Sequence, residues 1–188
     1  LQGRTENLDL FSTAWEVIER PWRAFQRISV ARHKNYAYFL SGGAGIAMAF
    51  AIFWLVKAGE YAGSLLTILA AGASLGPPFG VILILSVALL SWGVAKALSL
   101  PMTYRNIVAV FAYSLVPIVL SVICVLPIEI LTFGLFFFTR NPSPALLKPS
   151  SYLLLLALDG LFLFWTLVLQ HIGLRVLLEA GWVKTLLV

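Results

Sequence analysis

The chain has 188 residues, of which 61% are hydrophobic and 11% charged, and its mean hydropathy is +0.95. A soluble domain has about 45–50% apolar and about 25% charged residues, so this composition excludes a water-soluble fold. The net charge is +5, but the basic residues flank apolar segments, which argues against a nucleic-acid partner. The single cysteine, Cys124, excludes an internal disulfide and is expected to be a buried, inert thiol.

Residues 1–35 are predicted to form a cytoplasmic amphipathic segment, and residues 36–188 a transmembrane helical domain. Pro21 is expected to divide the first segment into two short helices, because proline is tolerated at a first helical position but not inside a helix. Large apolar side chains recur on one helical face, at Trp15, Ile18, Trp22 and Phe25. This pattern predicts either an interfacial helix that contacts the membrane surface or a helix that docks onto the protein's own bundle, and we weigh both equally.

Four apolar stretches are long enough to cross the bilayer, since about 20 helical residues cover a hydrocarbon core of about 30 Å. They are expected at Tyr36 to Val56, Pro77 to Ala95, Asn106 to Leu126 and Tyr152 to His171, with a fifth helix starting after Trp182. The predicted fold class is therefore an all-α, polytopic transmembrane helix bundle. The first span carries a stripe of small residues, Gly43, Ala47 and Ala51, which predicts close helix packing in lipid.

Two further apolar pieces are predicted not to span. Residues 61–76 are closed by Pro77 and Pro78 and indicate a re-entrant or interfacial segment, and residues 127–138 indicate a short tilted piece after the third span. With a cytoplasmic amino terminus, this arrangement places ten of the 13 lysines and arginines inside. The excess follows the positive-inside rule. We expect a prokaryotic plasma (inner) membrane location.

Asp159 is the clearest candidate for an intramembrane polar site, because an acid inside a span is costly. No lysine or arginine lies at comparable depth, so we expect its carboxyl to be protonated. Pro117 is predicted to leave the carbonyl of Tyr113 unpaired, and that carbonyl or the Tyr113 hydroxyl offers Asp159 a partner. Asp159 serves either a proton or ion relay or a structural hydrogen bond. Glu129 is expected to be solvated near the outer interface.

The chain lacks the common catalytic and nucleotide-binding motifs, including H-E-x-x-H, C-x-x-C, G-x-S-x-G and the Walker loop. We therefore expect no enzyme activity, no cofactor and no metal site. The favoured function is a non-enzymatic membrane interaction protein, a scaffold or accessory subunit with protein partners or a second copy as well as membrane lipid. The alternative is a transporter or channel component built around Asp159 and the Pro117 kink.

Three stretches resemble the Yip domain family. They are Glu19-Arg20-Pro21-Trp22-Arg23-Ala24-Phe25-Gln26-Arg27-Ile28, Phe111-Ala112-Tyr113-Ser114-Leu115-Val116-Pro117, and Leu158-Asp159-Gly160-Leu161-Phe162-Leu163-Phe164-Trp165 through Gly173-Leu174-Arg175. The resemblance implies a five-helix membrane protein of the prokaryotic branch. Eukaryotic members associate with Rab-type GTPases through a long cytosolic amino-terminal region. That region is absent from this sequence, so no Rab-type GTPase partner is expected.

Overall fold

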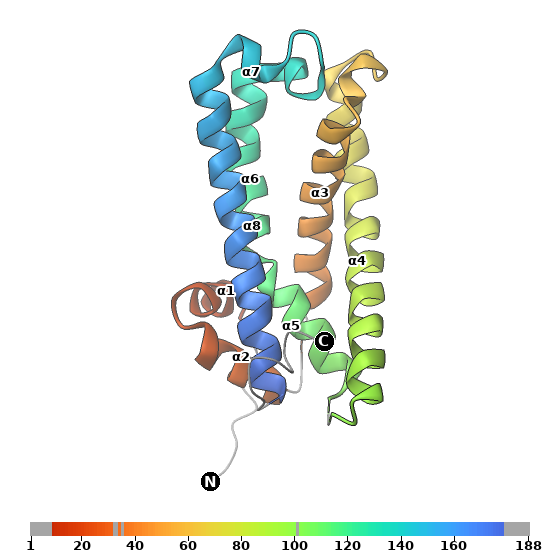
Figure 1. The fold of residues 1–188 in the computed structure, drawn as a ribbon, viewed down its shortest axis with the longest axis vertical. Helices are drawn as coiled ribbons and strands as arrows, with labels where there is room; N and C mark the ends of the chain where they lie inside the picture. Colours follow the sequence, from red (N-terminus) through yellow and green to blue (C-terminus); the bar gives the residue numbers. More distant parts are fainter. Residues whose placement is uncertain (1–8, 32–33, 35, 101, 179–188) are drawn as a thin grey trace. The chain divides into compact units, whose positions relative to one another are not determined.

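The computed structural model describes residues 9–31, 34, 36–100 and 102–178, and every regular element in these ranges is a helix (Figure 1). The elements are α1 (Leu10–Glu19), α2 (Pro21–Val30), α3 (Ala37–Leu55), η1 (Ala58–Glu60), α4 (Leu65–Ala97), α5 (Tyr104–Ser114), α6 (Val116–Phe133), η2 (Gly134–Phe138), α7 (Pro144–Leu147) and α8 (Pro149–Leu178). Four segments are long and apolar enough to cross a membrane, namely Ala37–Leu55, Leu65–Ala97, Tyr104–Phe138 and Pro149–Leu178. The predicted all-α, four-span fold is confirmed, whereas the helix expected after Trp182 lies outside the described residues.

The chain forms two compact units, which are described separately. Unit 1 comprises residues 1–41, 82–116 and 165–188, and unit 2 comprises residues 42–81 and 117–164. This division follows spatial contacts and differs from the sequence boundary predicted at residue 35. Three long helices, α3, α4 and α8, therefore each contribute one part to unit 1 and the other to unit 2.

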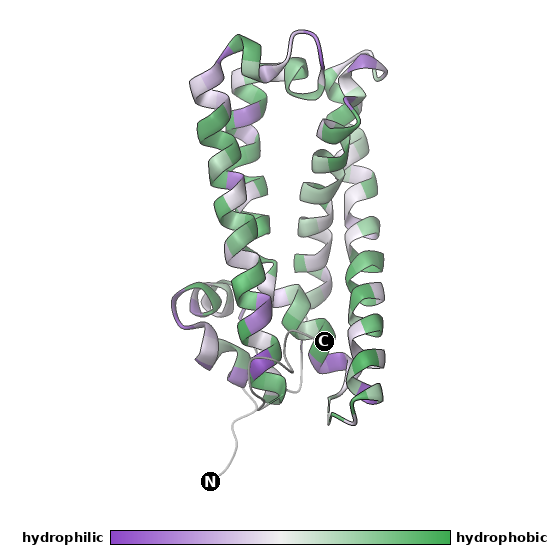
Figure 2. Ribbon diagram, in the orientation of Figure 1, coloured by the Kyte–Doolittle hydropathy of each residue, from purple (hydrophilic) through white to green (hydrophobic). Residues whose placement is uncertain are grey.

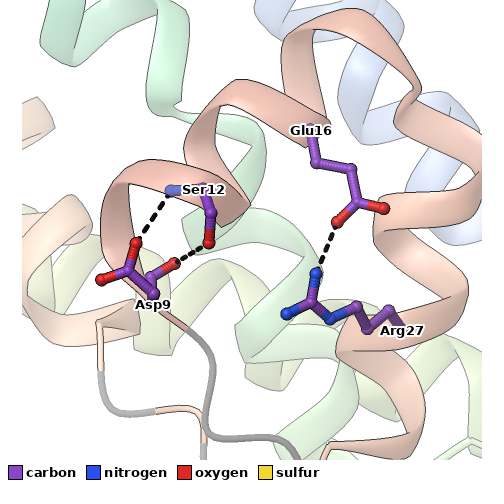
Figure 3. A network of polar contacts seen from close by, with 4 residues as sticks. All are labelled: Asp9, Ser12, Glu16 and Arg27. Atoms are coloured by element: carbon purple, nitrogen blue, oxygen red, sulfur yellow. Dashed lines mark hydrogen bonds and ion pairs between the residues drawn. The ribbon is translucent and has the colours of Figure 1, made fainter.

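In unit 1, the amphipathic segment consists of two helices that meet at Pro21, as predicted. The Asp9 side chain caps α1 by accepting from the Ser12 backbone N–H at 3.0 Å, which satisfies one donor of the first turn. The Arg27 guanidinium of α2 donates to the Glu16 carboxylate of α1 at 2.9 Å, and this half-buried ion pair holds the two helices together (Figure 3). The segment is thus a folded helix pair rather than one continuous helix.

The centre of unit 1 is α5, in which every residue from Ile107 to Ser114 is buried. Helix α2 packs against α5. At the start of α5, the Tyr104 hydroxyl donates to the Leu85 carbonyl of α4 at 3.0 Å. Next to it, the Lys34 ammonium donates to the Asn106 side-chain oxygen and, at 3.5 Å, to the Ser29 carbonyl. Burial, with a smaller contribution from Arg105, lowers the pKa of Lys34 to about 8.

In unit 2, α3 and α4 approach so closely that side chains are excluded at the contact. A Cβ atom on Gly45 would lie 2.1 Å from the carbonyl oxygen of Gly76 and 2.6 Å from the backbone of Gly80. Of the predicted stripe, Gly43 faces Val119 of α6 instead, and Ala47 is half-buried and Ala51 exposed. The closest contact between these helices therefore uses glycines on α4 as well as on α3.

Two predicted interruptions are wrong. Residues 65–97 form one helix that continues through Pro77 and Pro78, so no separate re-entrant segment exists at 61–76, and α6 continues through Pro127 to Phe133. In an apolar environment, unwinding a helix would expose several unpaired backbone groups, which costs more than the hydrogen bonds that a proline removes. The real interruption lies at Leu115, where α5 ends and α6 begins.

Cys124 also differs from expectation, because its side chain is exposed on α6. Apolar side chains in a membrane helix do not need to be covered by protein, since lipid tails are as apolar as leucine. A position inside a span therefore does not imply burial within the fold.

Candidate functional site

The candidate site is a cluster of polar side chains from α6 and α8 within unit 2. The Ser121 hydroxyl donates to Oδ1 of Asp159 at 2.5 Å. The Glu129 carboxyl lies close enough to the Asp159 carboxyl for the two acids to interact electrostatically. Glu129 is only 5% exposed, and the other two side chains are half-buried. Two acids and a hydroxyl therefore meet inside apolar helices.

The local sequence explains how α6 presents its part of the cluster. Ser121, Val125 and Glu129 follow one another at four-residue steps, which places them along one side of a helix. Val125, which lies between Ser121 and Glu129 in the sequence, is buried. This alignment requires α6 to remain helical through Pro127, because an interruption there would rotate Glu129 away from Ser121.

Two neighbouring acids are an unusual arrangement inside apolar helices. Carboxylates side by side repel each other, and burial removes the water that would screen them. The Ser121 hydroxyl supplies a hydrogen-bond donor to Asp159. Pairs of acids inside spans are the kind of group that proton pathways in membrane proteins use.

Further polar groups connect this pair to the end of unit 2. The Tyr152 side chain lies close to Glu129 and to the Trp54 side chain. The Lys57 ammonium lies 4.4 Å from the centre of the Trp54 ring. Lys57, Trp54, Tyr152, Glu129 and Asp159 thus form a continuous series of polar or charged groups.

Next to Lys57, the loop between α3 and α4 contacts the segment that follows η2. Glu60 accepts from the backbone N–H of Arg140 at 3.0 Å, and a Cβ on Gly59 would lie 2.9 Å from the Phe138 carbonyl oxygen. Burial, and next the nearby Arg140 charge, lowers the pKa of Lys57, whereas Glu60 opposes that shift. Figure 2 shows hydrophilic residues in the loops that connect α3 to α4 and η2 to α7.

The structure places only some of the predicted site residues in this cluster. Asp159 is in the cluster, whereas Glu129 is buried rather than solvated as expected. Pro117 is the second residue of α6, so it follows a helix break instead of kinking a continuous helix, and the Tyr113 carbonyl accepts from the Leu115 N–H. Tyr113 itself belongs to unit 1, where its buried hydroxyl makes no regular hydrogen bond with the described residues.

The predicted surface residues divide between the two interpretations. Trp15 and Trp22 are 68% and 44% exposed, and Ile18 is half-buried. Phe25 is fully buried and packs beside Gly173 of α8, where an added Cβ would lie 3.2 Å from the ring. Both tryptophans are therefore accessible for membrane contact, while the phenylalanine docks onto the protein.

The four apolar helices place this chain among the multi-pass integral membrane proteins. Comparison with family models, with curated proteins and with solved structures finds no match to it. The resemblance to the Yip domain family stays a prediction from the residues that carry it. Within the described ranges, no group of three histidine, cysteine or acidic side chains could hold a metal ion.

Proposed function

We propose that the protein is a component of a proton-linked transport or channel process, in which the Glu129–Asp159 pair takes up and releases a proton. The observation that supports this proposal is the placement of two acids next to each other inside the spans, where Glu129 is buried and Asp159 accepts from Ser121. An ionised acid at the centre of a span costs about 2.5–3.5 kcal/mol on insertion scales. A hydrogen bond between membrane helices returns on average only about 0.6 kcal/mol. Helix packing alone therefore gives little reason to place two acids together.

Tyr152 gives the pair one neighbouring group for proton exchange. Its hydroxyl can both accept and donate a hydrogen bond, and it lies close to Glu129. Loss of a proton leaves the pair with one more negative charge in an apolar environment. The cost of that charge favours a different arrangement of the surrounding helices. In transporters, such a change in charge at an intramembrane site is coupled to rearrangement of helices.

The test is a proton flux assay with the purified protein in liposomes that contain a pH-sensitive dye, under an imposed membrane potential. Glu129→Gln and Asp159→Asn are expected to lose most of the flux, because the amides keep the shape of the side chains but cannot exchange a proton. Glu19→Gln is the matched control, since it neutralises an exposed acid outside the spans and away from the polar series. Wild-type flux no greater than in protein-free liposomes, or equal flux in all variants, would reject the proposal.

A second candidate function is a membrane interaction protein, a scaffold or accessory subunit. It is favoured by α8, of which only 17% is buried over its most apolar window, and by Gly160, where an added Cβ would meet no neighbour within 4 Å. A small residue on an exposed helix lets another helix approach closely in lipid. Gly160→Leu should then dissociate an oligomer or complex recovered in mild detergent, and a wild-type monomer without partners would exclude this function.

A further inference from the structure

Unit 1 contains a basic cavity that the carboxyl pair does not involve. Its volume is about 640 Å³, within the range of small-molecule sites. It is lined by Arg20, Pro21, Trp22, Arg23, His171, Ile172 and Arg175. Three of these seven residues are arginines and none is acidic, so the lining favours an anion.

The cavity is formed where the start of α2 lies beside the carboxy-terminal part of α8. Pro21 is the first residue of α2, and Arg20 and Arg23 flank its first turn. On α8, His171 and Arg175 are four residues apart and therefore share one face. The Arg175 guanidinium lies 5.7 Å from the centre of the Trp22 ring, a distance that allows a cation–π contact.

Close packing fixes the two walls relative to each other within unit 1. A Cβ atom on Gly173 would lie 2.5 Å from Val110 and 3.2 Å from the Phe25 ring. Phe25 and Val110 are both buried. Because Gly173 lies between His171 and Arg175, this packing fixes the backbone position of both basic residues. The arginines are thus presented by a fixed backbone rather than by a mobile loop.

The electrostatics of the cavity match a phosphate group. Arginine offers several N–H donors in a planar arrangement that fits phosphate oxygens in pairs. A carboxylate oxygen of Glu19 lies 3.7 Å from the Arg20 guanidinium, and both side chains are more than half exposed. Such an exposed ion pair is weak, so Glu19 neutralises little of the Arg20 charge.

The surroundings of the cavity favour a lipid as the source of that phosphate. Trp22 belongs to the lining and is partly exposed, and Trp15 and Phe11 of the adjoining helix α1 are largely exposed. Exposed tryptophans beside membrane helices are typical of the depth at which lipid headgroups lie. Basic pockets between membrane helices are known to bind such headgroups.

We propose that this cavity binds a phosphate group, and that the group belongs to the headgroup of an anionic phospholipid. The inference is independent of the proton-linked function. It also differs from general attraction to a charged membrane, because it assigns one saturable site to four basic side chains, Arg20, Arg23, His171 and Arg175.

The experiment titrates the purified full chain in detergent with phosphatidylglycerol, phosphatidylcholine or inorganic phosphate, and counts bound ligand by native mass spectrometry. Wild type is expected to bind one phosphatidylglycerol saturably and in preference to phosphatidylcholine. The variant Arg23→Gln/Arg175→Gln should bind about thirtyfold more weakly, since each arginine near an anionic headgroup contributes roughly fivefold in affinity. The control Arg140→Gln/Lys148→Gln removes the same charge from unit 2 and should leave the affinity unchanged.

The outcomes separate the alternatives. Competition by inorganic phosphate at millimolar concentration, without preferential lipid binding, would support a phosphate site and overturn its assignment to lipid. Equal weakening in both double variants, or no saturable binding of any of the three ligands, would overturn the site itself. Arg23→Gln alone guards against misfolding, because Arg23 is exposed, and about a fivefold loss is expected from it.

Discussion

The two units contain buried ionisable groups that are stabilised in opposite ways. In unit 1, the Lys34 ammonium is 8% exposed and its hydrogen-bond partners are neutral oxygens of Asn106 and Ser29. In unit 2, Glu129 is similarly buried, but its partner is another acid, Asp159. A cation with neutral acceptors keeps its charge at an energetic cost. Two neighbouring carboxylates have no such neutral partner in each other, because their charges repel.

The largest expected loss of stability comes from filling a glycine contact between helices, and its size should differ between the two units. Gly45→Val should destabilise the fold by about 3 kcal/mol or more, because its Cβ would meet backbone atoms of α4 that cannot turn aside. Gly173→Ala in unit 1 should cost only about 1 kcal/mol, since its neighbours are side chains of Val110 and Phe25. Thermal unfolding in detergent measures both, and equal losses would contradict the distinction.

Lys34 predicts a pH dependence of stability that arises in unit 1. Its pKa is about 8 in the folded state against 10.5 ordinarily, so between these values the unfolded chain binds the additional proton. Stability should therefore rise as pH increases from about 8 to about 10.5, by up to about 3 kcal/mol. Unfolding followed over this pH range should show the rise in wild type, and Lys34→Met should remove most of it. An identical pH profile in both proteins would show that Lys34 does not cause it.

Removal of the Asn106 acceptor tests how the buried Lys34 charge of unit 1 is stabilised. Asn106→Leu should destabilise the protein by about 2 kcal/mol at pH 7, because it leaves the buried Lys34 ammonium without its side-chain acceptor. In the double variant with Lys34→Met, the additional loss from Asn106→Leu should fall to a small value. If the loss persists in the Lys34→Met background, the Asn106 side chain is important for another contact.

The smallest effect is expected at the carboxyl pair itself. Ser121→Ala removes the hydroxyl donor to Asp159 and leaves both acids in place. The loss should be about 1 kcal/mol, which thermal unfolding can measure against Ser86→Ala on α4, where the exposed hydroxyl bonds only its own helix. A much larger loss at Ser121 would show that this hydroxyl, rather than the acid pair, holds the two helices.

Sequence reasoning found the spans because hydropathy alone determines which helices are stable in a bilayer. It also located the division at Pro21, where a proline can start a helix. It failed at Pro77, Pro78 and Pro127, because rules for proline come from water, in which a broken helix can bond to solvent.

The partner of Asp159 was missed for a related reason. The predicted third span ends at Leu126, so it does not place Ser121, Val125 and Glu129 on one face of a single helix. The basic cavity joins Arg23 to Arg175, and no spacing rule relates side chains so distant in sequence. Both sites depend on tertiary packing, which hydropathy and local patterns do not contain.

Cys124 gives this protein a natural position for a spectroscopic label. It is the single thiol of the chain, its side chain is exposed on α6, and it lies between Ser121 and Glu129 in the same helix. A nitroxide attached there would need no change to any other residue. Its mobility and its accessibility to lipid-soluble quenchers, recorded at different pH values, would report directly whether α6 moves when the neighbouring acids exchange their proton.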